Sequence, residues 1–137
     1  MRKLLLLFSA IVATSCSHSN DSVSNTNSSY INPPTWIQGT WVQEGSTVGN
    51  GYIFTTNDFL LKNQTAGNTS FKQAIETTNS TGGNASATEE ITTTIYNISI
   101  TIGAQTYVYN FQKVSATKIE WMNDPLGSSV HTYYNKQ

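Results

Sequence analysis

The sequence predicts an all-β fold, a small up-and-down antiparallel β-barrel of about eight short strands formed by residues 34–137. Three observations lead to this prediction. Apolar and polar residues alternate in the C-terminal half, clusters of Gly, Asn, Ser and Asp separate the apolar runs, and no stretch has a convincing helical period. Closure into a barrel removes the two exposed edges of an open sheet. A two-sheet sandwich is the alternative, but its crossing connections suit the short turns less well.

Each expected strand is bounded by a turn cluster, and the strands cover residues 36–43, 51–56, 59–63, 70–77, 90–102, 106–114, 117–123 and 130–136. The clearest alternation of apolar and polar residues runs from Tyr96 to Ile102 and predicts a strand with one buried and one solvent-exposed face. Gly-Ala-Gln at 103–105 then forms a hairpin turn. Residues 71–78 come closest to a helix, but they end in β-branched residues and show no cap, so a strand is predicted there too.

The first 15 residues have the parts of a secretion signal in the right order. Arg2 and Lys3 form a positive start, an apolar run continues from Leu4 to Val12, and small residues precede Cys16. A membrane-spanning helix needs about 20 apolar residues, so this run is too short to remain as an anchor. Residues 1–15 are therefore predicted to be a cleaved signal peptide.

Cys16 is the only cysteine, which excludes a disulfide within this chain and a cysteine metal site. Its position after the apolar run resembles the lipobox of bacterial lipoproteins, in which the thiol is coupled to diacylglycerol before cleavage. The resemblance implies an exported protein that is attached to a membrane by lipid. Ser17 follows the cysteine where an Asp would favour inner-membrane retention in many bacteria, so the outer membrane is expected. The periplasmic and the outer face both remain open.

Residues 16–33 are predicted to form a disordered Ser/Asn-rich tether that ends at Pro33-Pro34. They offer too little apolar area to offset a backbone entropy of about 1–2 kcal/mol per residue. His18 is expected to be solvated there. Asp21-Ser22-Val23 resembles the O-glycosylation signal of exported proteins of the Bacteroidetes, which implies a modified Ser22. Without residues 1–15 the chain has 5 Lys against 8 Asp and Glu, which gives a net charge of −3, and its sequence shows no cluster of basic residues. Nucleic acid is therefore not an expected partner.

The first barrel strand begins with Gly39-Thr40-Trp41, which resembles the Gly-x-Trp signature of lipocalins. The remaining domain is loosely similar to small lipocalin-like lipoproteins of the Bacteroidetes. In that family the Trp plugs one end of the barrel, often under a basic residue from the end of the last strand. The resemblance implies this role for Trp41, with Gly39 beside it and Lys136 above it. A large ring also fills a tapering barrel end better than an aliphatic side chain does.

No catalytic residue, metal site or cofactor is predicted. His131 has no recognisable acid or hydroxyl partner and is expected at the surface. Glu89 and Glu90 are adjacent, and neighbours in a strand point to opposite faces, so a catalytic carboxylate pair is not expected. The sequence has neither phosphate-binding loops nor metal-ligand spacings.

Two functions remain open for the exported domain. The barrel binds a small apolar or amphipathic ligand, with Trp36, Tyr107, Tyr109 and Trp121 as candidate contacts, or it is a non-enzymatic structural or protein-interaction module with a filled interior. An interior apolar void of roughly 300 Å³ or more would favour the ligand, and a filled interior would favour the module. The sequence does not define an oligomeric state.

Overall fold

The computed structural model of the whole chain describes residues 24–28, 31–127 and 129–137. The predicted signal peptide, Cys16, His18 and Ser22 lie outside the described residues. Among the described residues, no helix is long and apolar enough to cross a membrane.

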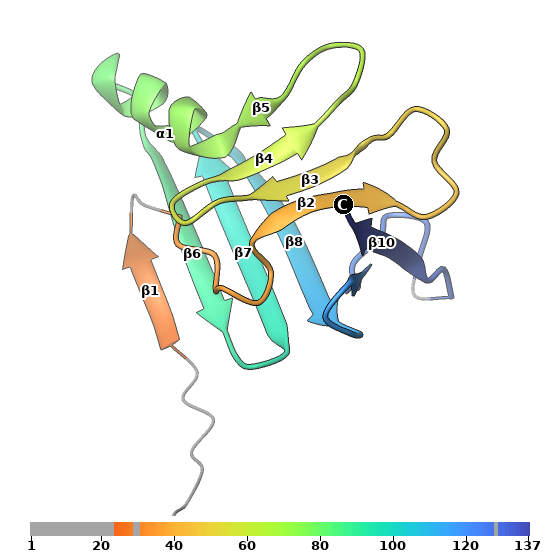
Figure 1. Cartoon of the computed structure of the whole chain (residues 1–137). Helices are drawn as coiled ribbons and strands as arrows, with labels where there is room; N and C mark the ends of the chain where they lie inside the picture. The colour runs from red at the N-terminus through yellow and green to blue at the C-terminus, as the bar shows by residue number, and fades with distance from the viewer. Residues whose placement is uncertain (1–23, 29–30, 128) are drawn as a thin grey trace, which may run out of the picture.

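The described residues form one antiparallel sheet of 10 strands, which curls into a half-barrel with a short helix at its opening (Figure 1). The predicted all-β, barrel-like fold is confirmed. The elements are β1 Ser24–Ser28, β2 Gly39–Gln43, β3 Gly51–Phe54, β4 Phe59–Lys62, β5 Thr69–Ser70, α1 Phe71–Ser80, β6 Ala85–Ile91, β7 Ile95–Ile102, β8 Gln105–Lys113, β9 Lys118–Trp121 and β10 Thr132–Lys136.

The topology is a meander that returns to its own start. Strands β2 to β5 pair in sequence order, β6 to β10 do the same, and β10 pairs with β2, so that Lys136 lies opposite Trp41. Among the described residues no pairing joins β5 to β6, which leaves the barrel open at that point. Helix α1 contacts β4, β6 and β7 and therefore lies across this opening (Figure 1).

The prediction of a strand over residues 70–77 is wrong, because residues 71–80 form helix α1. Ser70 is its N-cap, and the Ser70 Oγ accepts a hydrogen bond from the Gln73 N–H at 2.9 Å. The Asp58 carboxylate adds a second cap, since it accepts hydrogen bonds from the Lys72 N–H at 3.0 Å and from the Ser70 hydroxyl at 2.6 Å. These caps satisfy backbone donors that the first helical turn leaves free.

The single strand predicted over residues 90–102 is in fact two, β6 and β7. Thr92 makes the turn between them, because its Oγ1 accepts hydrogen bonds from the backbone N–H groups of Thr94, at 3.2 Å, and Ile95, at 2.8 Å. A threonine hydroxyl that bonds to nearby backbone replaces the Gly or Asn that usually marks a hairpin turn. The sequence therefore carries no obvious break at this point.

The N-terminal boundary also differs from the expected tether over residues 16–33. Ser24–Ser28 pairs with β6 as strand β1, with Ser24 opposite Ile91 and Ser28 opposite Ala87. Ile31 is fully buried in the core. Strand pairing uses backbone groups, so a composition that is poor in apolar side chains does not prevent it.

Trp41 is fully buried at the β2–β10 pairing. Its indole N–H donates to the Ile37 carbonyl oxygen at 2.6 Å, and the Lys136 Nζ lies 5.3 Å from the ring centroid. Gly39 has a φ of +131°, and a Cβ at this position would lie 2.7 Å from the Lys136 Cε. The backbone at position 39 therefore leaves the space that the lysine stem uses above the tryptophan.

We predict that Trp41→Ala lowers the free energy of unfolding by about 3–5 kcal/mol, as other large-to-small core substitutions do. The change removes a fully buried ring and an indole hydrogen bond. Urea unfolding of the mature wild type and variant measures the loss. A loss below about 1 kcal/mol would contradict a core role for Trp41.

Candidate functional site

Aromatic side chains fill the inside of the half-barrel. Tyr52 lies near the centre of the group, with ring centroids 5.1 Å from Phe111 and 4.8 Å from Tyr134. The other rings that join this cluster through ring-to-ring contacts are Phe54, Phe59, Phe71, Tyr96, Tyr107, Tyr109 and Trp121. The space that a ligand would occupy in a hollow barrel therefore contains the protein's own side chains.

Three of the four residues that the sequence offered as ligand contacts lie together. Tyr109 and Trp121 stack with their ring centroids 6.2 Å apart, and Tyr107, which is 38% exposed, contacts Phe71. The Trp121 Nε1 is buried without a hydrogen-bond partner in the described part of the chain. Trp36 is separate from this group, because its indole N–H donates to the Thr92 carbonyl oxygen in the β6–β7 turn at 3.1 Å.

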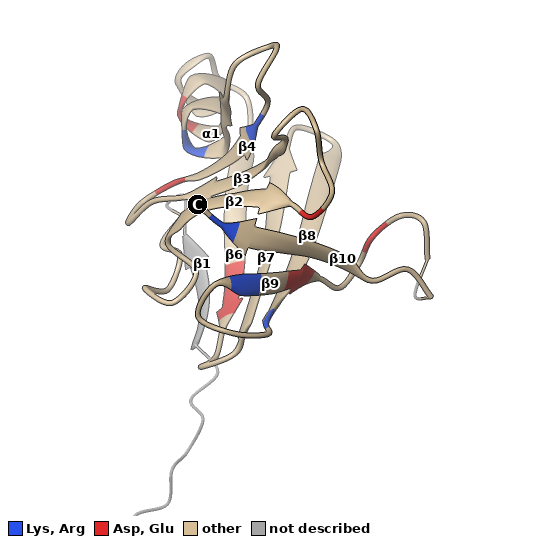
Figure 2. Ribbon diagram, turned by 45° about the vertical axis from the view of Figure 1, so that its right-hand side comes forward, with Lys and Arg blue, Asp and Glu red and all other residues tan. Residues whose placement is uncertain are grey.

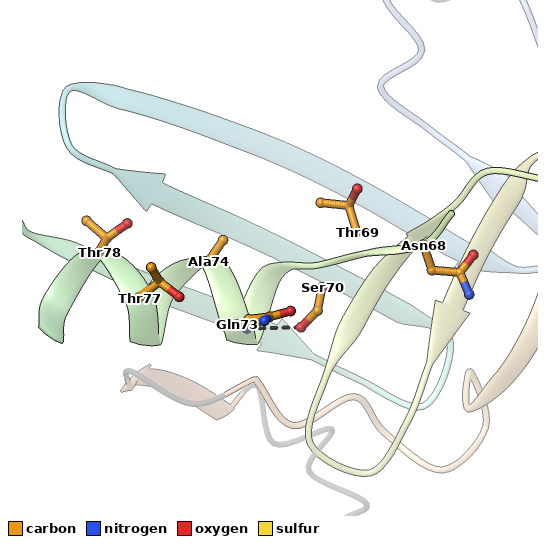
Figure 3. A pocket seen from close by; sticks show the side chains of 7 residues that line it. All are labelled: Asn68, Thr69, Ser70, Gln73, Ala74, Thr77 and Thr78. Carbon is orange, nitrogen blue, oxygen red and sulfur yellow. Dashed lines mark hydrogen bonds between the residues drawn. The ribbon is translucent and has the colours of Figure 1, made fainter. Parts of the chain in front are cut away.

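Two hollows lie on the outside of the described structure. The first, which we call the α1 hollow, has a volume of about 420 Å³ and follows β5 and one side of α1 (Figure 3). It is lined by Asn68, Thr69, Ser70, Gln73, Ala74, Thr77 and Thr78. The second, the β2–β4 hollow, measures about 770 Å³ and is lined by Thr40, Val42, Ser46, Thr47, Gly49, Lys62, Gln64 and Gln137. Neither lining includes an aromatic side chain.

The two hollows differ in charge. The lining of the α1 hollow contains no ionisable side chain. The β2–β4 hollow contains Lys62, whose Nζ donates to the Gly49 carbonyl oxygen at 2.5 Å, and the C-terminal residue Gln137. Over the described part of the chain, acidic and basic residues are interspersed along the ribbon (Figure 2). The α1 hollow is thus a locally uncharged site on a protein of mixed surface charge.

Glu89, which the sequence analysis considered only as part of an unexpected carboxylate pair with Glu90, is a buried carboxylate. Glu89 and Glu90 point to opposite faces of β6, as expected, and Glu89 is the inward one, with 1% exposure. Its two oxygens accept hydrogen bonds from the Asn32 N–H at 2.9 and 3.0 Å, and the Tyr96 hydroxyl donates to it at 2.6 Å. Burial raises the pKa of Glu89, while these hydrogen bonds oppose the rise. The sequence signal for this burial is the period of two in β6, which places Glu89 on the same inward face as Ala85 and Ala87.

His131 has an acidic partner that the sequence did not reveal. Its Nδ1 lies 2.6 Å from the Glu120 Oε1, and the histidine side chain is 63% exposed. This pair joins β9 to the residue directly before β10. Within the described ranges, no group of three or more His, Cys, Asp or Glu side chains is arranged to hold a metal ion.

Comparisons with known proteins give no relative for this chain: no family model matches it, and neither does a curated protein or a solved structure.

We predict that Glu89→Gln changes the pH dependence of stability. The pKa of Glu89 is raised in the folded state, so its contribution to stability is fully present below the unfolded value of about 4.5 and is lost as pH rises through the folded pKa. Glutamine carries no charge to desolvate, so the wild type should lose stability relative to the variant over that window. Urea unfolding of both proteins from pH 4 upward measures the difference, and a difference that does not change with pH would contradict the assignment.

Proposed function

We propose that this protein is a lipid-anchored lipoprotein of the outer membrane whose packed half-barrel works as a non-enzymatic interaction module of the cell envelope. The observation that supports an interaction module is that aromatic side chains fill the interior of the half-barrel. Tyr52, Phe59 and Phe111 contact one another across the inside, where a lipocalin-type ligand would need an apolar void. Binding is therefore expected on the outer surface.

A small apolar ligand at the side of the barrel is the second candidate. The observation that favours it is the buried Trp121 N–H without a partner, beside the half-buried ring of Tyr109. A ligand that carries a hydrogen-bond acceptor would satisfy this donor, since an unpaired buried donor costs about 1–3 kcal/mol. This ligand would have to enter among rings that already contact one another.

The two candidates differ in a titration with a fluorescent fatty-acid analogue. With a packed interior we predict no saturable binding to the native protein, because in the described part of the chain aromatic rings occupy the space that an acyl chain would need. Enhanced probe fluorescence should appear only in urea or acid, where packing loosens. One-to-one binding to the native protein, weakened by Tyr109→Ala but not by Trp36→Ala, would overturn the packed-module proposal in favour of the second candidate.

Membrane attachment rests on Cys16 and the signal-like residues before it. We predict that Cys16→Ser abolishes labelling by radioactive palmitate and releases the protein from the membrane fraction, since it removes the acceptor thiol. Far-ultraviolet circular dichroism of the purified variant should still show the wild-type strand content. Equal palmitate labelling of wild type and variant would contradict the proposal, and protease treatment of intact cells would tell the periplasmic face from the outer one.

A further inference from the structure

We propose that the α1 hollow binds a short, uncharged oligosaccharide through the amide and hydroxyl side chains of Asn68, Thr69, Gln73, Thr77 and Thr78. The inference rests on the proposed function, because it names the ligand class of the surface module. The hollow's volume of about 420 Å³ lies within the range of about 300–1,000 Å³ that is typical of small-ligand clefts.

The side chains that line the α1 hollow have unused hydrogen-bonding capacity. Within the described residues, the side chains of Gln73, Thr77 and Thr78 make no hydrogen bond to the protein, although each can both donate and accept. Asn68 and Thr69, on the other wall, are likewise without protein partners (Figure 3). Sugar hydroxyls donate and accept in the same way, so they match this lining better than a ligand that offers only donors or only acceptors.

The electrostatics of the α1 hollow favour an uncharged ligand. A helix N-terminus normally favours an anion, but here the Asp58 carboxylate already accepts hydrogen bonds from the Ser70 hydroxyl and the Lys72 N–H. The Lys72 Nζ and the Glu76 Oε1 lie 4.0 Å apart on the same helix, so their opposite charges offset each other. The lining contains no charged side chain, so neither an anionic nor a cationic ligand would form an ion pair in this site.

The packing of α1 against the sheet makes the α1 hollow rigid. Phe71 and Ile75 are buried against the sheet, which fixes the helix, while Gln73 and Thr77 are one turn apart on its exposed side. Ala74 and the threonine methyl groups give the lining apolar patches for the C–H faces of a sugar ring. A polar site on a helix held by its packing loses little side-chain and backbone freedom on binding.

Strand β1 and the α1 hollow lie toward opposite ends of β6. Ser24 pairs with Ile91 at the end of β6, whereas α1 lies at the opposite end of that strand (Figure 1). The eight peptide steps from Cys16 to Ser24 reach at most about 30 Å. A lipid at Cys16 would therefore keep Ser24 and the β6–β7 turn within about 30 Å of the membrane, while α1 lies at the other end of β6.

The test is saturation-transfer difference NMR on the full mature protein in detergent, with neutral gluco-, manno-, galacto- and xylo-oligosaccharides of four to six units and an uncharged peptide of matched size. We expect saturable transfer to at least one neutral oligosaccharide. The double variant Gln73→Ala/Thr77→Ala should weaken that binding by about tenfold or more, since two hydrogen bonds are lost. Both changes introduce alanine, the best helix former, at exposed helix positions, so the variant should remain folded.

The matched control is Thr47→Ala/Gln64→Ala, which removes the same two side-chain types from the β2–β4 hollow and should leave the affinity unchanged. Transfer to no oligosaccharide, transfer to the peptide alone, or equal affinity of wild type and Gln73→Ala/Thr77→Ala would each overturn the inference. The proposed function fails separately, through palmitate labelling or through the fatty-acid titration, and neither result depends on the sugar measurement.

Discussion

The pairing of β10 with β2 is the interaction on which the curled sheet depends. Without it, β2–β5 and β6–β10 would be two separate meanders joined in sequence through α1. The pairing makes them one sheet, sets Lys136 opposite Trp41 and brings the lysine Nζ over the buried indole ring. These residues lie far apart in the chain, so the loop-closure entropy must be overcome before the contact forms, and this joining step is expected to come late in folding.

The sheet does not close completely, and its remaining edges are covered in different ways. Helix α1 lies across the opening beyond β5, and β1 covers the edge of β6. On β8, which extends beyond the short β9, the Asn123 amide accepts from the Asn110 N–H at 2.7 Å and donates to the Val108 carbonyl oxygen at 2.8 Å. Helix, strand and side chain thus occupy backbone groups that an exposed edge would offer to another chain.

Sequence reasoning succeeded where side-chain alternation decides the structure and failed where local capping decides it. The alternation of β7 and β8 is visible because one face is buried and the other is wet. Helix α1 was missed because Ser70, directly before Phe71, was not recognised as its N-cap, and the second cap, Asp58, lies twelve residues earlier in the chain. The β6–β7 turn was missed because Thr92 makes it. The α1 hollow follows from this helix, so the sequence could not predict it.

Glu89 connects the interior with the path to the proposed anchor. It is the one buried carboxylate among the described residues, and the Asn32 N–H, on the segment between β1 and the barrel, is bonded to both of its oxygens. The N-terminal segment is therefore held to β6 by strand pairing and by an inward side chain. Because α1 also packs on β6, the N-terminal strand β1 and the α1 hollow are connected through the same strand.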